Sequence, residues 1–386
     1  MRILMLAEGD PETWSCWSGS ARGILEQLRA QGHTVETADV DLRGHDRWIA
    51  AGATLSPNRR RWATRYHLGA VPFELRSRKA DAAVARRRGR VDAILQIGAT
   101  FRTRRHGGVP RYLCCDSNIR VAEQGQSSGF SDASVLRPQE LRAIARREHA
   151  VYRDADGIFT LSERLRRSFV TDFGIPDDKV RAIYAGPNLD LAHIPRSKAP
   201  RPDAHPPTIL FVGFQFHRKG GDLRGESVRR VRRELPAARL VIAGPPADLS
   251  TEPGVVSLGN LDKQCPEDWQ KLLAAYESAD VFALPTRFEP FGIAFVEAMH
   301  FGLPCIGPDA WAVPEIIADG ETGFTVPPDN VEALTERLLD LLRNPALARR
   351  MGEAAQQRAR GLFTWQHAAA RLTGTIARQR EQPLTH

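Results

Sequence analysis

Residues 282–306, FALPTRFEPFGIAFVEAMHFGLPCI, give the clearest indication of the fold of this 386-residue chain. A short apolar run ends near Leu284, a loop with Glu289 follows, and a longer apolar stretch leads to a second short run that contains Cys305. This alternation predicts the strand, loop, helix and strand of a βαβ unit with a parallel sheet. Open sheets of this class bind ligands beyond the carboxyl ends of their strands, so we expect Glu289 at a ligand-binding edge.

The helix of this stretch is predicted to begin near Gly292. The amides of Phe291, Gly292 and Ile293 then have no partner inside the helix, and free donors at a helix start favour an anion such as a diphosphate. Glu297 lies about one and a half turns further on, with its side chain leaning back toward the helix start. Its carboxylate could accept hydrogen bonds from a ribose beside that diphosphate. Two acidic residues at this spacing also recur by chance in helical proteins.

The same alternation of short apolar runs and amphipathic stretches extends along the rest of the chain. Its length exceeds what one core usually organises, so two domains are expected. Residues 195–206 (PRSKAPRPDAHP) combine prolines with polar residues and have no periodicity, which is typical of an interdomain linker. We therefore predict an α/β protein with a first domain over residues 1–194, a linker over 195–207 and a second domain over 208–362, each with a mainly parallel sheet.

Composition and cysteine usage indicate a globular protein of a reducing compartment. No apolar run approaches the roughly 20 residues that span a bilayer. The opening apolar run stops at Glu8 and is interpreted as a first strand rather than a secretory signal. Five cysteines form no CxxC pair and no cluster at zinc spacing. We expect a cytoplasmic protein, soluble or at most peripheral at the inner membrane face, with no structural metal.

The net charge of +8 is unevenly distributed, because fourteen lysines and arginines lie between residues 59 and 105. Such a stretch fits an anionic partner, which could be a membrane surface, a phosphorylated acceptor or a nucleic acid. A solvated surface in an arginine-rich protein explains it equally well. No helix-turn-helix, zinc or aromatic RNA-binding pattern accompanies the arginines, and this argues against nucleic acid.

Glu289 and Glu297 resemble the E-x7-E signature of the family 4 retaining glycosyltransferases. The resemblance continues through residues 302–330 (GLPCIGPDAWAVPEIIADGETGFTVPPDN), which are similar to the segments that close this family's nucleotide site. It implies a GT-B fold, in which two Rossmann-like domains have parallel sheets that face each other across a cleft. It also implies a nucleotide-diphosphate sugar as donor, transfer with retention of anomeric configuration, and no metal. Trp311 and Ala312 depart from the pattern, since the family often has two glycines there.

By the same resemblance, Glu289 lies beside the donor sugar and Glu297 binds the ribose hydroxyls. The reaction is then expected to take place on one face of the donor sugar, where the acceptor hydroxyl attacks beside the departing diphosphate. The protein then contributes mainly positioning and electrostatics.

A glycine-rich basic patch, FVGFQFHRKGG at residues 211–221, follows the first strand of the second domain. Gly213 frees the backbone, and fixed cations stabilise the negative charge of a leaving nucleoside diphosphate without a metal. The family usually has an arginine directly after the glycine and a lysine five residues later. Lys219 matches the lysine, but Phe214 occupies the arginine position, so we assign the second charge to Arg218. An exposed basic turn is the alternative interpretation.

Three further places resemble ligand contacts of the family. Gly19 lies in the loop after the first strand, near the expected donor phosphates and acceptor. Asp116 ends a predicted strand, where many relatives have a histidine that touches the donor sugar. Asn260 and Leu261 lie in a loop that resembles the one whose backbone reads the nucleobase edge. A plain tight turn, a helix cap and an ordinary polar turn are the respective alternatives. The helix at 363–386 resembles the family's last helix, which returns to the first domain.

These features together predict a retaining, metal-independent hexosyltransferase with no cofactor beyond its donor substrate. The acceptor is expected to be a saccharide or a lipid-linked molecule, in the assembly of a cell-surface polysaccharide or glycolipid. Two alternatives stay open: a nucleotide-sugar epimerase of the same architecture, and a non-catalytic relative that acts as a binding protein.

Overall fold

The computed structural model describes residues 1–104, 108–198, 205–245 and 252–381. They divide into two compact units, the first comprising Met1–Ala185 with Trp365–His386 and the second Gly186–Thr364. The boundary between the units thus falls nine residues before the end of the first domain as predicted from sequence. Arg105 of the basic stretch and positions 199–204 of the expected linker lie outside the described residues.

The first unit is built on a parallel sheet, in which the described residues form six strands in the order β2-β1-β3-β4-β5-β6. Every residue of the third and fourth strands is buried, as expected for a sheet that is covered on both faces. The strands are β1 (Arg2–Ala7), β2 (Thr34–Asp39), β3 (Ala93–Ile97), β4 (Arg111–Cys115), β5 (Gly157–Thr160) and β6 (Val180–Ala182).

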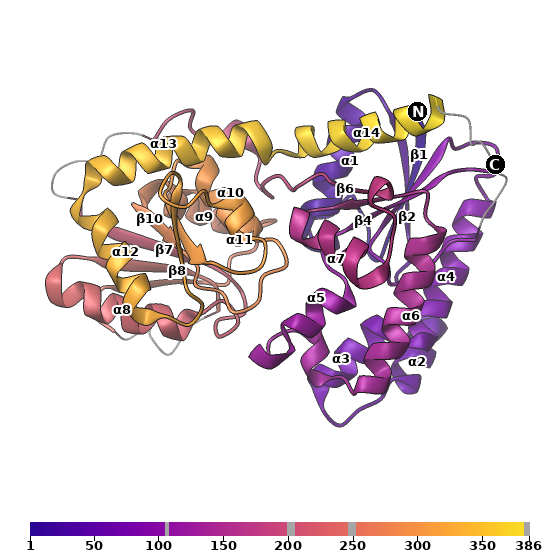
Figure 1. The fold of residues 1–386 in the computed structure, drawn as a ribbon, viewed down its shortest axis with the longest axis horizontal. Helices are drawn as coiled ribbons and strands as arrows, with labels where there is room; N and C mark the ends of the chain where they lie inside the picture. The colour runs from indigo at the N-terminus through magenta and orange to yellow at the C-terminus, as the bar shows by residue number, and fades with distance from the viewer. Residues whose placement is uncertain (105–107, 199–204, 246–251, 382–386) are drawn as a thin grey trace. The chain divides into compact units, whose positions relative to one another are not determined.

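Helices cover this sheet, and one of them comes from the far end of the chain. The helix α14 packs against α1 (Figure 1), and the two approach so closely that a Cβ on Gly23 would lie 2.4 Å from the Trp365 ring. Only glycine fits at that point of α1. The helices of this unit are α1 (Ser20–Ala30), α2 (Gly44–Ala53), α3 (Arg59–Leu68), α4 (Ala70–Ala85), α5 (Ile119–Gln124), α6 (Pro138–Asp154), α7 (Glu163–Phe173) and α14 (Trp365–Glu381).

The second unit has the same design, with the described strands in the order β12-β11-β10-β7-β8-β9 and all neighbours parallel. Its strands are β7 (Thr208–Val212), β8 (Arg239–Ala243), β9 (Val255–Gly259), β10 (Val281–Ala283), β11 (Cys305–Pro308) and β12 (Gly323–Val326). Its helices are α8 (Gly221–Glu234), α9 (Pro266–Ser278), α10 (Ile293–His300), α11 (Val313–Ile316), α12 (Val331–Arg343) and α13 (Pro345–Leu362).

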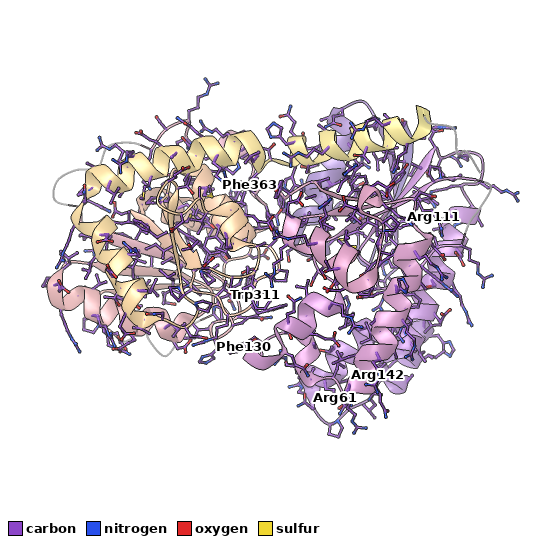
Figure 2. The ribbon with its side chains drawn as sticks, in the orientation of Figure 1. Arg61, Arg111, Phe130, Arg142, Trp311 and Phe363 are labelled. Atoms are coloured by element: carbon purple, nitrogen blue, oxygen red, sulfur yellow. The ribbon has the colours of Figure 1, made fainter. Side chains whose placement is uncertain are left out.

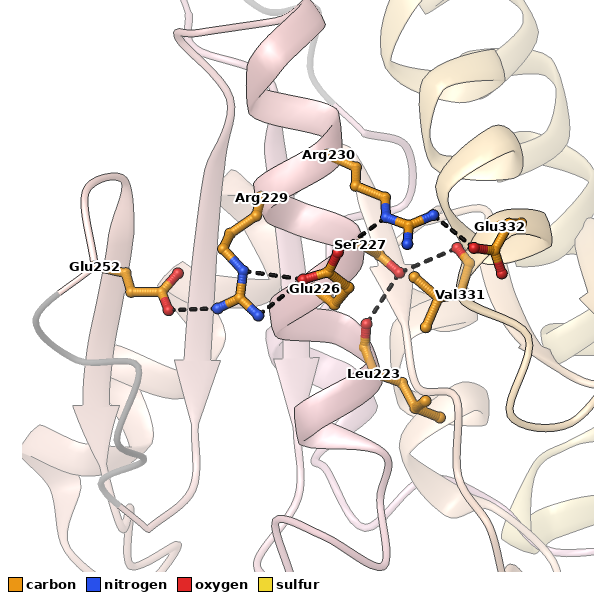
Figure 3. A network of polar contacts seen from close by, with 8 residues as sticks. All are labelled: Leu223, Glu226, Ser227, Arg229, Arg230, Glu252, Val331 and Glu332. Atoms are coloured by element: carbon orange, nitrogen blue, oxygen red, sulfur yellow. Dashed lines mark hydrogen bonds and ion pairs between the residues drawn. The ribbon is translucent and has the colours of Figure 1, made fainter.

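An exposed polar network ties α8 to its neighbours (Figure 3). Glu226 accepts from both Arg229 and Arg230 of the next turn, and these arginines reach on to Glu252 and Glu332 at 2.6 and 2.7 Å. Solvent screens such pairs, so we assign them a role in orienting α8 rather than in stabilising the unit.

The strand order of the second unit reverses between β7 and β10. From β7 the chain moves outward to β8 and β9, then returns to the other side of β7 to form β10. The loops that follow these two strands therefore diverge at a topological switch point, the usual ligand site of an open α/β sheet. The first unit has its own switch point, between β1 and β3.

Candidate functional site

Lys219 and Glu289 form a buried ion pair at the switch point of the second unit. Lys219 comes from the loop after β7 and Glu289 from the loop after β10, and the ammonium donates directly to the carboxylate Oε2. Only 11% of the lysine side chain and 9% of the glutamate side chain are exposed. Burial lowers the pKa of Lys219, and the Glu289 charge opposes that shift. The pair places one anchored cation and one anchored anion where a ligand of an α/β sheet binds.

Arg218 fastens the two loops to each other. Its Nη1 donates to the carbonyl of Phe288 at 2.6 Å, and its own carbonyl accepts from the Arg287 amide at 2.9 Å. Its charge also contributes to the lowered pKa of Lys219, so the two cations lie close together. Phe214, which occupies the position where the sequence pattern leads one to expect an arginine, is 67% exposed.

The helix α10 begins beside this pair. Its first residue is Ile293, one position beyond the predicted start, and Gly292 caps it with a φ of +115°. A Cβ on Gly292 would lie 2.9 Å from the Phe295 ring, so both backbone and space call for glycine. No side chain caps the helix, and within the described part of the chain the amides of residues 291–293 donate no hydrogen bond.

Trp311, labelled in Figure 2, contacts the loop that carries Glu289. Its indole Nε1 donates to the carbonyl of Arg287 at 3.1 Å, and its ring meets Phe288 edge to face with centroids 5.0 Å apart. Trp311 has a φ of +62°, a left-handed conformation that glycine adopts without strain. The tryptophan thus keeps the backbone shape of a glycine while it adds a clamp on the loop.

Glu297 is the centre of a second polar cluster. Its carboxylate is 4% exposed; Oε2 accepts from the Tyr276 hydroxyl at 2.9 Å, and Oε1 accepts from Lys263 Nζ at 2.8 Å and from the Asn188 amide at 3.2 Å. Burial and the Glu297 charge raise the pKa of Tyr276 well above its ordinary value, so the phenol stays a donor. Sequence reasoning identified Glu297 but missed its three partners.

The sequence contained a signal for one of these partners, Lys263. Lys263 lies two positions after Leu261, in the loop already selected as the base-reading loop. In the structure Leu261 is buried at 8% exposure and Asn260 is exposed, both directly after β9. At the end of β7, Gly213 allows a close approach, since a Cβ there would lie 3.0 Å from Lys219 Cγ.

In the first unit, Gly19 and Asp116 lie at the carboxyl ends of β1 and β4. Gly19 caps α1 with a φ of +92°, and the two residues before it, Trp17 and Ser18, also have positive φ, at 49° and 55°. Such strain costs about 1–3 kcal/mol for each residue and is typical of functional loops. Burial raises the pKa of Asp116, while a hydrogen bond from Trp17 lowers it. The loop after β1 and the end of β4 are therefore neighbours.

A further cluster at this edge was not predicted. Glu8 directly follows β1 and contacts Arg76 Nη2 at 2.5 Å and His67 Nδ1 at 3.4 Å. The Arg76 side chain is fully buried. Reduced hydration lowers the pKa of His67, but the Glu8 carboxylate raises it more, so the net pKa is above the ordinary value. An acid placed directly after the first strand was the available signal.

Metal ligands and disulfides are absent from the described part of the chain. It contains no group of three or more His, Cys, Asp or Glu side chains that could hold a metal ion. All five cysteines are free, and four of them are buried. Within the same residues, no helix has both the length and the apolar character needed to cross a membrane.

Comparison with known proteins assigns the second unit to a family. Residues 196–358 match the model of the family described as Glycosyl transferases group 1. A glycogen synthase of Mycobacterium tuberculosis is 30% identical over 267 residues, which are 66% of this chain and 60% of the relative. A GDP-mannose-dependent alpha-(1-6)-phosphatidylinositol monomannoside mannosyltransferase of Mycolicibacterium smegmatis is 29% identical over 292 residues, 68% of this chain and 71% of the relative. The chain thus spans less than two thirds of the length of the glycogen synthase that it matches.

Solved structures share the fold. The sucrose-phosphate synthase from Thermosynechococcus elongatus aligns with a TM-score of 0.69 at 20% identity and covers 99% of both chains. Anabaena HepE in complex with UDP-glucose aligns with a TM-score of 0.62 at 15% identity, over 98% of this chain and all of the other. The predicted family resemblance is confirmed for residues 196–358, and the predicted α/β fold class with two parallel sheets is confirmed. The chain carries a domain of the glycosyl transferases group 1 family, in a molecule built from the two Rossmann-like units of the GT-B fold.

Proposed function

We propose that this protein transfers a sugar from a nucleotide-diphosphate sugar to an acceptor, with retention of anomeric configuration and without a metal ion. One observation carries the proposal: the buried Lys219–Glu289 pair lies beside the uncapped start of α10, at the switch point of the second sheet. The family match of residues 196–358 supports it.

The start of α10 and the two cations form the diphosphate site of the proposed enzyme. Amides of residues 291–293 donate to the phosphate oxygens, and the helix dipole adds a partial positive charge. Lys219 and Arg218 supply full charges that need no reorganisation as the glycosidic bond breaks and negative charge grows on the leaving group. A lysine held by a buried glutamate is fixed in place, and its charge is available when a phosphate oxygen becomes a second partner.

Glu289 positions the donor sugar. A carboxylate that is held by Lys219 keeps lone pairs free for sugar hydroxyls, so one side chain aligns both the sugar and the cation. The acceptor hydroxyl then attacks on the face that the diphosphate leaves, and a diphosphate oxygen takes its proton. Positioning of this kind accounts for a large share of the rate enhancement when the reacting atoms are held in near-attack geometry.

The cluster around Glu297 holds the nucleoside. Lys263 and the Asn188 amide occupy both lone pairs of Oε1, and Tyr276 occupies one of Oε2, so Oε2 keeps a lone pair for a ribose hydroxyl. The backbone of Asn260 and Leu261 contacts the edge of the nucleobase. Gly213 has no side chain, so the donor can approach the backbone closely at the end of β7. Two of the solved structures with this fold are described as complexes with UDP and with UDP-glucose, which supports a nucleotide-sugar donor.

The first unit selects the acceptor in this proposal. Gly19 and Asp116 lie at the ligand-binding edge of its sheet, and the carboxylate of Asp116 suits sugar hydroxyls. We infer that the acceptor is a saccharide or a lipid-linked molecule in the assembly of a cell-surface polysaccharide or glycolipid. The free cysteines fit a reducing compartment, so we place the reaction in the cytoplasm.

Ligand-induced stabilisation tests the donor site. Purified protein is heated with UDP-, GDP- and ADP-sugars in the presence of EDTA, and the cognate donor is expected to raise Tm because it binds only the folded state. Product analysis with and without an acceptor extract then separates the alternatives. A transferase forms a glycoside of unchanged anomeric configuration only with acceptor. Conversion of the donor without acceptor indicates an epimerase, and binding without any product indicates a binding protein.

A further inference from the structure

The surface formed by the end of α2, the α2–α3 loop and the start of α4 is unusually apolar for exposed residues. Trp48 is 77% exposed, Leu55 66%, Ile49 41% and Val71 39%. Among the described residues, seven large hydrophobic side chains are exposed, and these four belong to one segment of 24 residues. We call Trp48, Ile49, Leu55 and Val71 the α2–α3 surface.

Contacts between the elements join these residues into one surface. Arg65 of α3 donates to the Leu55 carbonyl at 3.0 Å, and Trp62 donates to the Ala51 carbonyl at 3.1 Å. A cavity of about 250 Å³ opens beside them, with Ala53, Thr54 and Val71 in its wall. Ile49 lies one helical turn before Ala53, on the same face of α2.

Positive charge surrounds the α2–α3 surface. Residues 43–104 contain fifteen lysines and arginines but four acidic residues, so this segment carries more than the whole net charge of +8 and the remainder of the chain is net negative. Figure 2 labels Arg61 in this region; it pairs with Glu140 at 2.7 Å, as Arg65 does at 3.2 Å. By contrast, Arg47 and Arg59 are exposed, and their side chains make no ion pair or hydrogen bond within the described part of the chain.

We propose that the α2–α3 surface, together with Arg47 and Arg59, docks on an anionic lipid bilayer. A tryptophan ring is suited to the headgroup level of a membrane, and aliphatic side chains beside it enter the acyl boundary. Unpaired arginines beside them bind lipid phosphates. A protein partner would favour an apolar centre with the charges at the rim, whereas here the exposed Arg47 lies on the same helix as the exposed Trp48 and Ile49. This docking involves the first unit alone and does not depend on the proposed sugar transfer.

Vesicle co-sedimentation of the full chain tests the proposal without any donor. Wild-type protein is expected to pellet with phosphatidylcholine vesicles that contain phosphatidylglycerol, less with pure phosphatidylcholine, and less at high salt. The variant W48S/L55S is expected to lose roughly tenfold or more of its vesicle affinity, because it removes most of the inserted apolar area. The variant R47Q/R59Q is expected to lose the preference for anionic vesicles.

A matched control exists in the second unit. Leu191 and Val256 are 43% and 42% exposed, so L191S/V256S removes exposed apolar area elsewhere and is expected to sediment like the wild type. The donor-induced rise in Tm is measured on every variant, so failure of docking and failure of the proposed function are read separately. Equal sedimentation of wild type and W48S/L55S, or no preference for anionic lipid, would overturn the proposal. Retention on DNA that W48S/L55S leaves unchanged, without vesicle binding, would assign the arginines to a polyanion instead.

Discussion

Lys219 and Glu289 lie 70 positions apart in the sequence and depend on each other in the structure. A buried charge is tolerated when a partner of opposite charge compensates it, and removal of one partner alone leaves the other unpaired. The pair therefore couples stability to activity, and variants of a single residue affect both. Neutral replacement of both partners separates the two effects.

We expect Lys219→Ala to lower kcat by about 100-fold or more, since it removes a fixed cation from the leaving group. The double variant K219M/E289Q carries no uncompensated buried charge, so it should unfold in urea close to the wild-type midpoint while it stays inactive. Lys271→Ala, which removes an exposed lysine paired with Asp268, serves as control. Normal turnover by a folded Lys219→Ala protein would exclude the proposed role.

Glu148 is a buried acid outside the candidate site, and its titration can be measured. It is 9% exposed and accepts a hydrogen bond from the Ile119 amide at 3.0 Å, at the start of α5. Burial raises its pKa to about 7 from an ordinary 4.5. The folded state therefore holds a proton that the unfolded chain releases, so the contribution to stability is full below pH 4.5 and is lost as the pH rises through 7.

The variant Glu148→Gln keeps the acceptor for Ile119 and removes the titration. We expect its free energy of unfolding to depend less on pH between about 4.5 and 7 than that of the wild type, by on the order of 3 kcal/mol over the window. Urea titrations at pH 5 and pH 8 measure the difference. Glu336→Gln, at an exposed position of α12, is the control, and parallel curves for wild type and Glu148→Gln would contradict the expectation.

Residues of the candidate site were predictable where the signal is local. Glu289 and Gly292 belong to one strand-loop-helix unit, so their relation follows from short-range geometry. Lys219 was selected by resemblance, but its contact with Glu289 needs the parallel pairing of β7 with β10. The partners of Glu297 come from a helix, a loop and a segment before β7, and no short-range pattern connects such distant positions. The chemical roles of these residues stay predictions.

At the scale of elements, the contact of α1 with α14 depends on one missing methyl group. Gly23 faces the Trp365 ring, and any Cβ there would meet the indole at 2.4 Å. Because α14 comes from the end of the described chain, residues near it in sequence do not hold it on the first unit. The contact with α1 does.

We expect Gly23→Ala to destabilise the first unit by about 1–3 kcal/mol, because the ring must shift to admit the methyl group. Gly361→Ala is the matched control: it also lies in a helix, has open space at its Cβ, and should be neutral or slightly stabilising. Thermal unfolding of the two variants measures the difference. Equal Tm values would show that the α1–α14 contact adapts without cost.

Strands and their parallel pairing were the easiest elements to predict, since buried strands produce continuous apolar runs such as AILQI in β3. The start of α12 is also set locally, because the Asn330 side chain caps it by accepting a hydrogen bond from the Ala333 amide. The division between units was harder to predict. Composition marks prolines at residues 195–206, but the second unit already begins at Gly186, where contacts and not composition decide the boundary.

At the scale of the whole molecule, each unit has its own sheet and core. We therefore expect calorimetry to resolve two unfolding transitions. At a concentration 100 times its Kd, the cognate donor should raise the free energy of unfolding of the second unit by about 2.7 kcal/mol, and so raise the temperature of its transition. The transition of the first unit should stay nearly unchanged. Gly23→Ala identifies the first unit's transition by lowering it. A single transition that donor and variant shift alike would mean that the units unfold together.

The place of α14 has a consequence for biosynthesis. The first unit is discontinuous: residues 1–185 start it and residues from 365 onward finish it, while the second unit is one uninterrupted stretch of chain. During translation the second unit can thus complete its fold while the first still lacks a helix. Until residues 365–381 have left the ribosome, the face of α1 that contains Gly23 is exposed on the nascent chain. We expect chaperones to bind the first unit mainly during this interval.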